Sequence, residues 1–305
     1  MKQVDWTFGG LWPYAPQWFD TPDGRLHYID EGPKNKPPVV FVHGNPEWSF
    51  YFRHDIAALL QAGLRVVAID HLGFGRSDKP SNAALYDIER HTKRLSLLLD
   101  SLNLKDITFV CHDWGGPIGL PWAVQHPEQV RSLCVLNSIG TRPDGPTPMP
   151  VPIKVLRSHG AGDVLVKGLN LFTKLFMFKA GVTHPDHLTP QIKQAYLAPH
   201  PSWNSRTGVL AFPRQIPLGP TDRSAQGLGL IEDGLRKHFT DKSVHIIWAM
   251  KDISFQPAVL KKWQALFPRA TTVVLEDAGH FAEEDEPERV AQAIVACATE
   301  AGSLK

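Results

Sequence analysis

Short apolar runs alternate with amphipathic segments along the first half of the chain, and this pattern predicts an α/β fold. Each run is rich in apolar and β-branched residues and ends in a polar or glycine-bearing turn, which is typical of strands buried on both faces of a parallel sheet. Between two such runs, residues 86–102 repeat leucine and isoleucine at near-helical spacing. The predicted strands are 26–30, 39–42, 65–69, 107–111 and 133–136, followed late in the chain by 244–249 and 272–275.

The pattern changes near residue 140. Five prolines between residues 143 and 152 are incompatible with a continuing helix or a central strand. Helical patterning without a convincing strand then continues to about residue 235. We therefore expect an α/β core, residues 1–140 and 236–305, interrupted by a helical cap at 141–235. Core helices are expected at 117–125, at 257–267 and from about 287 to 301.

Composition and charge fit a globular enzyme. The 305 residues are 43% hydrophobic and 21% charged, which suits a well-packed domain. The net charge of +1 gives no electrostatic support for binding nucleic acid or an anionic membrane. Three widely spaced cysteines predict neither a disulfide framework nor a metal site. The first residues lack a secretory signal and no apolar run is long enough to span a bilayer, so we expect a cytoplasmic protein, with a monomer as the default.

The strongest chemical signal is a turn with an acidic residue at its centre. The strand 107–111 runs through His112-Asp113-Trp114-Gly115-Gly116 into a helix. Such a strand-to-helix turn lifts one reactive side chain above the sheet, as in the nucleophile elbow of α/β-hydrolase folds. No GxSxG sequence occurs, so Asp113 stands in the nucleophile's position, and the alternative is an aspartate that only caps the helix. A carboxylate at this point can attack an sp³ carbon and form an alkyl ester.

Two later strands end near residues that complete a catalytic triad in the order nucleophile, acid, histidine. The next-to-last predicted strand leads to Asp252, and the last one leads to Asp277 and His280. We expect Asp252 to be the acid. Asp277 is a weaker rival because it lies close in sequence to His280. The fold can also place the acid after the preceding strand, but Asn137 and no carboxylate stands there. In this scheme Asp113 attacks carbon, His280 activates the water that cleaves the ester, and Asp252 stabilises the imidazolium.

Asn45 and Trp114 are candidates for binding the reaction's negative charges. Their backbone N–H groups are placed to form an oxyanion hole for the tetrahedral intermediate of ester hydrolysis. Their side chains add a carboxamide and an indole N–H donor that can converge on one anion. For Trp114 the alternative is core packing, and for Asn45 it is a turn before a proline. Two uncharged donors favour a halide, which leaves without taking up a proton.

These motifs resemble those of haloalkane dehalogenases over most of the chain. The resemblance rests on HGNPEWSF (43–50), DHLGFGRSDKP (70–80), CHDWGG (111–116), AFPRQIP (211–217), AMKD (249–252) and GHF (279–281). It implies an α/β-hydrolase fold with a cap, and hydrolysis of a haloalkane to an alcohol, halide and a proton through an aspartyl ester. Water would be the only other reactant, with no cofactor and no metal. The implied residues are the nucleophile Asp113, the base His280, the acid Asp252 and the halide-binding pair Asn45 and Trp114.

The cap leaves two further questions open. Trp203 is its only tryptophan and lies in a polar, proline-rich stretch, so it is a poor substitute for Asn45 as a halide donor. The apolar side chains either line a pocket over Asp113 or only pack the cap onto the core. They are Phe172, Phe176, Phe178 and Phe212.

Other functions on the same scaffold remain open from the sequence. An epoxide hydrolase shares the HDWGG turn and the triad order, but that family typically uses two cap tyrosines, and the insertion holds only Tyr196. A fluoroacetate dehalogenase would be expected to have arginine in place of Trp114. A luciferase-like oxygenase, a receptor without turnover and a metal hydrolase are weaker alternatives. The metal alternative rests on side chains near strand ends: His43, Asp70, His71, His112 and Asp113.

Overall fold

The core of the molecule is an eight-stranded sheet in the order β1-β2-β4-β3-β5-β6-β7-β8. The structure is a computed structural model that describes residues 4–147, 149 and 151–300. The pairs β1–β2 and β2–β4 are antiparallel and every pair from β4 to β8 is parallel. The strands are β1 (Gln17–Thr21), β2 (Gly24–Glu31), β3 (Pro38–Val42), β4 (Arg65–Ile69), β5 (Ile107–Asp113), β6 (Val130–Ser138), β7 (Ser243–Ala249) and β8 (Thr271–Leu275).

The central strands are buried along their whole length, which explains their continuous apolar sequence. Every residue of β3 and of β5 is buried, because helices cover both faces of a parallel sheet. All seven predicted strands are confirmed, with ends shifted by a few residues. The edge strand β1 was not predicted. Its five residues are exposed or only partly buried, so they carry no apolar run that would signal a strand.

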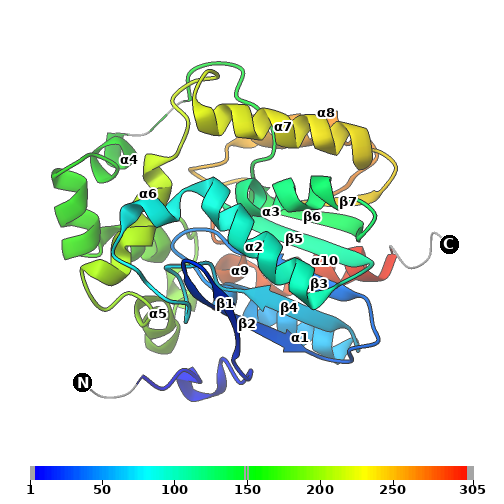
Figure 1. The fold of residues 1–305 in the computed structure, drawn as a ribbon, viewed down its shortest axis with the longest axis horizontal. Helices are drawn as coiled ribbons and strands as arrows, with labels where there is room; N and C mark the ends of the chain where they lie inside the picture. Colours follow the sequence, from blue (N-terminus) through cyan, green and yellow to red (C-terminus); the bar gives the residue numbers. More distant parts are fainter. Residues whose placement is uncertain (1–3, 148, 150, 301–305) are drawn as a thin grey trace.

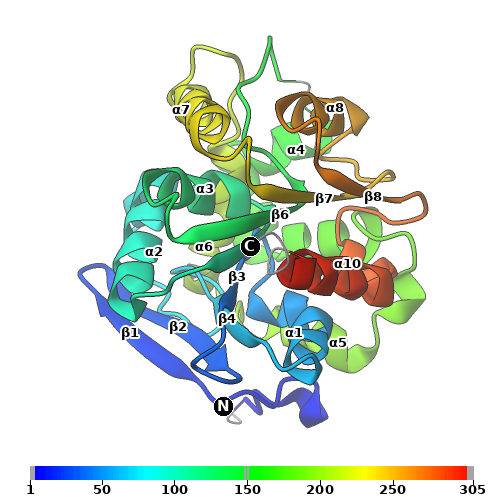
Figure 2. The same cartoon turned by 90° about the vertical axis from the view of Figure 1, so that its right-hand side faces the viewer.

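Helices form two layers around the sheet (Figures 1 and 2). One face carries α2 (Ile88–Leu102), α3 (Gly115–Gln125), α7 (Arg223–His238) and α8 (Pro257–Leu266), and the other carries α1 (Arg53–Gln61) and α10 (Pro287–Glu300). The predicted helices at 86–102, 117–125, 257–267 and 287–301 are therefore confirmed, except that residue 301 lies outside the described residues. Short helices at loops are η1 (Phe8–Gly10), η2 (Ser49–Phe52), η3 (Ala83–Tyr86) and α9 (Ala282–Asp285).

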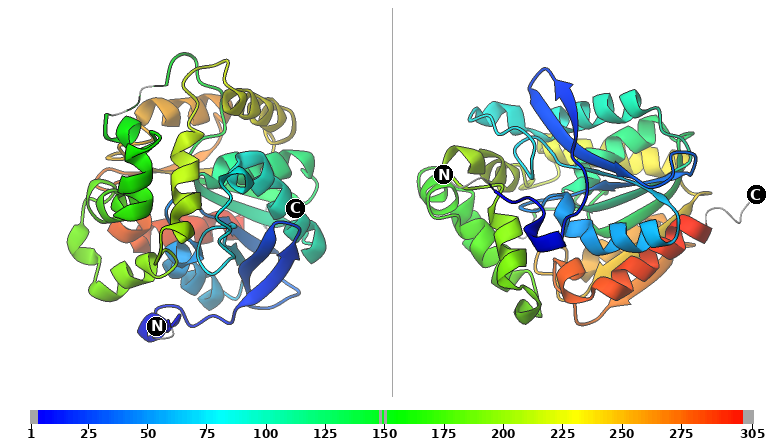
Figure 3. Two further views of the ribbon diagram at one scale, coloured as in Figure 1. Left: turned by 60° about the vertical axis from the view of Figure 1, so that its left-hand side comes forward. Right: turned by 90° about the horizontal axis from the view of Figure 1, so that it is seen from below.

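The described residues between β6 and β7 form helices and no strand. Those from α4 to α6 lie together on one side of the core in Figures 1 and 3. The last helix of this stretch, α7, contacts α3 of the core. We propose the whole span 141–235 as one insertion, of which Pro148 and Pro150 lie outside the described residues. Before α7 it contains α4 (Val151–Leu156), the π-helices η4 (Asp163–Gly168) and η5 (Phe172–Ala180), η6 (Pro185–His187), α5 (Pro190–Leu197), η7 (Asn204–Arg206) and α6 (Thr207–Arg214).

The parallel register brings the carboxyl ends of six strands, β4, β3, β5, β6, β7 and β8, to one edge of the sheet. Ligands of open α/β sheets bind at this edge, outside the carboxyl ends of the strands. The candidate catalytic residues lie at this edge: Asp113 is the last residue of β5, and Asp252 and His280 lie on the loops that follow β7 and β8. The register pairs are Val42 with Cys111, Asp113 with Ser138, Leu136 with Ile247, and Ala249 with Leu275.

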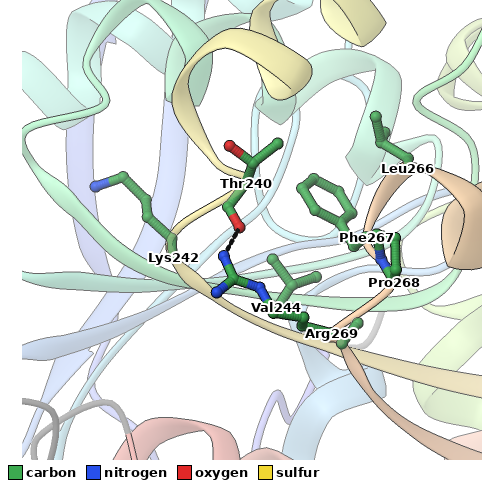
Figure 4. Close-up of a pocket in the computed structure, with 8 residues that line it drawn as sticks. Thr240, Lys242, Val244, Leu266, Phe267, Pro268 and Arg269 are labelled. Atoms are coloured by element: carbon green, nitrogen blue, oxygen red, sulfur yellow. Dashed lines mark hydrogen bonds between the residues drawn. The ribbon is translucent and has the colours of Figure 1, made fainter.

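A surface hollow lies at the other edge, around the amino ends of β7 and β8 (Figure 4). Arg269 donates a hydrogen bond to the carbonyl oxygen of Thr240 across it, at 2.8 Å. It contains none of the candidate catalytic residues. Among the residues that the structure describes, no helix is both long enough and apolar enough to cross a bilayer.

Candidate active site

Asp113 is the last residue of β5 and lies on a sharp turn into α3. Its φ of 49° is in the left-handed region, which is uncommon for a residue other than glycine and typical of a nucleophile elbow. Glycines make this turn possible, because a Cβ on Gly44 would collide with the Asp113 side chain and one on Gly115 with the carbonyl of Val42. Ser138 Oγ donates a hydrogen bond to the Asp113 carbonyl at 2.6 Å. Neighbouring strands thus hold the turn in place from both sides.

The two oxygens of the Asp113 carboxylate have different surroundings. Oδ2 accepts the backbone N–H of Asn45 at 2.8 Å, whereas Oδ1 makes no hydrogen bond among the described residues. The Asn45 amide therefore holds Oδ2, while Oδ1 is left without a donor among the described residues. The residue is 6% exposed, and burial raises its pKa to about 6 against the opposing charges of His280 and His112. At neutral pH the carboxylate is still mostly ionised.

His280 is hydrogen-bonded to Asp252 and not to the rival Asp277. The distance from His280 Nδ1 to Asp252 Oδ2 is 2.9 Å. Asp277 is exposed and forms an ion pair of 2.7 Å with Lys251. The other ring nitrogen, Nε2 of His280, is buried and has no partner in the described part of the chain. It is therefore free to bind a water molecule.

Asp252 is surrounded by hydrogen-bond donors. Besides His280, Asn137 Nδ2 donates to Oδ2 at 2.8 Å, and the N–H groups of Ser254 and Phe255 donate to Oδ1 at 2.6 and 3.1 Å. Burial favours the neutral acid, but these partners, led by the charge of His280, outweigh it and lower the Asp252 pKa. Asn137 was considered only as the position of a missing acid. Asn137 is the next-to-last residue of β6 and Asp252 follows β7, and these two strands are neighbours in the sheet. This adjacency is the signal from which the contact between Asn137 and Asp252 could have been predicted.

The protonation of His280 depends on the charge of Asp113. Burial lowers the His280 pKa, but the carboxylates of Asp252 and Asp113, with a smaller effect from Glu47, outweigh it and raise that pKa to about 9. Esterification would neutralise Asp113 and remove its part of this effect. Loss of the negative charge on Asp113 would therefore lower the His280 pKa and favour the neutral imidazole.

Replacing Asp252 with asparagine is expected to slow the hydrolysis of an ester on Asp113 by about 10²-fold or more. The variant removes the charge that stabilises the His280 imidazolium and the acceptor that fixes its tautomer. Rapid quenching of a single turnover would give this rate. Asp277→Asn is the matched control and should hydrolyse the ester at the wild-type rate. Equal rates for Asp252→Asn and wild type would contradict the assignment of the acid.

Asn45 contacts the Asp113 carboxylate through its backbone N–H, and Trp114 follows Asp113 directly in the chain. The buried Asn45 side chain donates one Nδ2 hydrogen to the carbonyl of Val209 in α6 at 3.2 Å, which leaves its second N–H for another acceptor. Trp114 precedes α3, and its ring centroid lies 5.2 Å from that of Phe212. Neither its indole nor its backbone N–H is bonded among the described residues, and only the Asn45 amide reaches Asp113.

Two of the four cap phenylalanines border the site. The Phe176 ring lies 5.1 Å from the His280 ring, and Phe212 lies against Trp114. Phe172 packs behind Phe176 at 5.3 Å, and Phe178 lies 6.5 Å from the ring of Tyr196. Phe176 and Phe212 therefore fit the prediction that cap side chains line a pocket. Phe172 and Phe178 fit the alternative that they only pack within the cap.

Tyr196 was considered as a residue of an epoxide hydrolase and Trp203 as a substitute halide donor, and each contacts residues outside the proposed triad. The hydroxyl of Tyr196 donates to Oε1 of Glu284, whose carboxylate also binds Arg53 through two hydrogen bonds of 2.6 and 2.7 Å. Trp203 is 45% exposed, and Lys167 Nζ lies 5.1 Å from its ring centroid. The Tyr196 hydroxyl is thus already bonded to Glu284, and the Trp203 ring is partly exposed at the surface of the cap.

The histidines and acids near the strand ends bind one another and the backbone. His43 Nδ1 lies 2.7 Å from the Gly44 carbonyl oxygen, and its Nε2 accepts the N–H of His71 at 3.0 Å. Asp70 Oδ2 lies 2.7 Å from Nδ1 of His27. Within the described ranges, no three such side chains are grouped in a way that could hold a metal ion. These contacts instead fix the loops after β3 and β4.

The comparison with known families identifies the fold. Residues 37–287 match the family described as alpha/beta hydrolase fold. The chain belongs to this family. Over 290 residues this α/β hydrolase is 34% identical to haloalkane dehalogenase 2 of Mycobacterium tuberculosis, covering 93% of the chain and 95% of the relative. Over 296 residues it is 36% identical to a cis-3-alkyl-4-alkyloxetan-2-one decarboxylase of Shewanella oneidensis, covering 96% and 91%.

Solved structures support the same placement. The α/β hydrolase resembles the tetrameric haloalkane dehalogenase DpaA of Paraglaciecola agarilytica with a TM-score of 0.78 and 30% identity, covering 93% of each chain. It resembles the haloalkane dehalogenase DatA of Agrobacterium tumefaciens with a TM-score of 0.83 and 26% identity, covering 94% and 97%. These comparisons confirm the predicted fold and the kinship with haloalkane dehalogenases. The decarboxylase relatives were not anticipated from the sequence.

Proposed function

We propose that this α/β hydrolase is a haloalkane dehalogenase, which converts a haloalkane and water to an alcohol, a halide ion and a proton. The observation that carries the proposal is the buried carboxylate of Asp113 at the elbow, where a serine would favour acyl transfer. A carboxylate is already a nucleophile and needs no base in the first step. The dehalogenase relatives and neighbours support the same activity.

In the first step Oδ1 of Asp113 attacks the carbon that carries the halogen. The new C–O bond forms as the carbon–halogen bond breaks, and the halide leaves with the bonding electron pair. The indole N–H of Trp114 and the unbonded Nδ2 hydrogen of Asn45 receive the anion. Uncharged N–H donors stabilise an anion without transferring a proton to it, which suits a halide.

In the second step a water molecule hydrolyses the ester. Nε2 of His280 takes a proton from the water, whose oxygen attacks the carbonyl carbon of the Asp113 ester. The negative charge that develops on Oδ2 faces the N–H of Asn45, 2.8 Å away in the resting structure. Collapse expels the alcohol, which receives the proton from His280, and the carboxyl of Asp113 releases the net proton. Asp252 stabilises the imidazolium throughout.

A second candidate is the decarboxylation of an oxetan-2-one. The observation that favours it is the pair of relatives named for this activity, at 36% and 32% identity. Attack by Asp113 on the sp³ carbon bonded to the ring oxygen would open the lactone and leave a carboxylate, an anion that the same donors can receive. Loss of carbon dioxide with expulsion of the Asp113 carboxylate would then form an alkene. This route consumes no water and does not require His280 as a base.

An assay of purified protein on four substrates separates these functions. We expect halide and acid from 1-bromobutane and 1,2-dibromoethane without any added cofactor. Alkene and carbon dioxide from a cis-3,4-dialkyloxetan-2-one, with no halide from the bromoalkanes, would replace the proposal with the second candidate. Diol from styrene oxide without halide release would indicate an epoxide hydrolase. That outcome is not expected, because the hydroxyl of Tyr196 is bound to Glu284.

A further inference from the structure

A buried pair, Glu47 and His112, lies directly behind the triad and has no role in the steps above. Both side chains are completely buried. Glu47 belongs to the loop after β3, and His112 is the residue before Asp113 in β5. Oε1 of Glu47 and Nδ1 of His112 are 2.6 Å apart, which is the distance of a strong, charge-assisted hydrogen bond.

The partners of the His112 ring define where its protons lie. Nε2 faces the backbone carbonyl oxygen of His280 at 3.0 Å, and a carbonyl can only accept, so Nε2 carries a hydrogen. A further proton lies between Nδ1 and Oε1 of Glu47. The same Oε1 also accepts the N–H of Gly44 at 2.7 Å. Two donors on one oxygen favour an ionised Glu47, and the charge of His112 lowers the Glu47 pKa although burial raises it.

Through these bonds Glu47 is linked to three parts of the site. Its bond to Gly44 fixes the residue before Asn45, whose N–H binds Oδ2 of Asp113. Its bond to His112 orients the ring that precedes the nucleophile, and that ring in turn binds the main chain of His280. A single carboxylate therefore connects the oxyanion loop, the nucleophile strand and the loop of the base.

We infer that Glu47 is a positioning residue for the proposed hydrolysis, acting through His112 on the main chain of His280 and through Gly44 on the Asn45 amide. The inference rests on the proposed function. Both connections end on groups that act in ester hydrolysis, namely the base and the oxyanion donor. The first step requires only Asp113 and the side-chain donors for the leaving anion, so loss of Glu47 affects the second step more than the first.

The pair is enclosed by other polar and titratable side chains from several elements. The Tyr51 ring of η2 stacks on His112 at 4.7 Å, and the His280 ring lies 4.9 Å from it. His43, from the loop after β3, and Asp113 also interact electrostatically with members of the pair. The amide oxygen of a glutamine at position 47 could still accept from the Gly44 N–H and from His112 Nδ1. It carries no negative charge, however, so the positive charge on His112 would be buried without a partner.

The test compares the two steps in Glu47→Gln. We expect kcat, which reports ester hydrolysis when that step is slow, to fall by about 10- to 100-fold, as for a small misplacement of catalytic groups. We expect kcat/KM, which reports the alkylation step, to stay within about threefold of wild type. Glu283→Gln is the matched control, because Glu283 is equally buried and interacts electrostatically with Asp55 and Glu284 instead of the triad. This control should change neither constant by more than about threefold.

A double-mutant cycle shows whether Glu47 acts through His112. If it does, Glu47→Gln combined with His112→Gln should hydrolyse the ester no more slowly than the slower single variant, within about threefold. Circular dichroism would verify folding, and His112→Gln alone carries the test of the two steps if Glu47→Gln does not fold. Equal losses in kcat and kcat/KM, an unchanged kcat, or multiplied effects in the double variant would overturn the inference. If wild type releases no halide at all, the proposed function fails instead.

Discussion

Replacing Asp113 with alanine is expected to reduce halide release by about 10⁴-fold or more, to the level of the reaction in buffer. The variant lacks Oδ1 of Asp113, the proposed nucleophile, and loss of a catalytic nucleophile has effects of this size in other hydrolases. A coloured pH indicator or ion chromatography of bromide, with 1,2-dibromoethane as substrate, would measure the loss.

Asp277→Ala is the control for this experiment. Asp277 also follows a strand at the same edge of the sheet, but its side chain is exposed and bound to Lys251. This variant should retain the wild-type rate, because a surface ion pair contributes little to stability. Halide release by Asp113→Ala at more than a few per cent of the wild-type rate would show that the nucleophile lies elsewhere.

Replacing His280 with alanine is expected to limit the enzyme to one turnover. The ionised Asp113 attacks without help from a base, so one halide ion per active site should appear at close to the wild-type rate. Ester hydrolysis should then slow by about 10²- to 10⁴-fold, which is the usual contribution of a general base. Rapid-mixing measurements of halide release would show a burst of one equivalent followed by a slow phase.

The same variant also separates the two candidate functions. An elimination that expels the Asp113 carboxylate needs no water, so His280→Ala would still turn over an oxetan-2-one repeatedly. His187→Ala is a suitable control for the substitution itself, since His187 binds the backbone carbonyl of Glu284 at the surface of the cap. Multiple turnovers of a bromoalkane by His280→Ala at the wild-type rate would contradict the role of the base.

The core elements were predictable because their sequence signals are strong and local. The parallel strands are buried on both faces, so each one is a continuous apolar run followed by a polar loop. The strand β1 was missed, because it lies at the sheet edge and its residues are exposed or partly exposed. The two π-helices of the insertion, η4 and η5, could be predicted as helical but not as π-helices, since that geometry depends on packing.

The arrangement of the candidate site was predictable where a residue's position at the end of a strand determines which edge of the sheet it reaches. Asp113, Asp252 and His280 follow three parallel strands, and the register brings them to one edge. The contacts behind them were not predictable, because they join loops far apart in sequence. Asn137 reaches Asp252 across 115 residues, and Glu47 reaches His112 across 65. Such contacts depend on the side-chain packing of the folded core, which no local pattern encodes.

The central claim is that Asp113 forms a covalent alkyl ester, and peptide mass spectrometry of His280→Ala tests it most directly. The variant would be incubated with 1-bromobutane, denatured in acid and digested. We expect the peptide containing Asp113 to gain the mass of one butyl group, and fragmentation to place this group on the Asp113 side chain. An unmodified peptide after a full equivalent of bromide has been released, or a butyl group on any other residue, would contradict it.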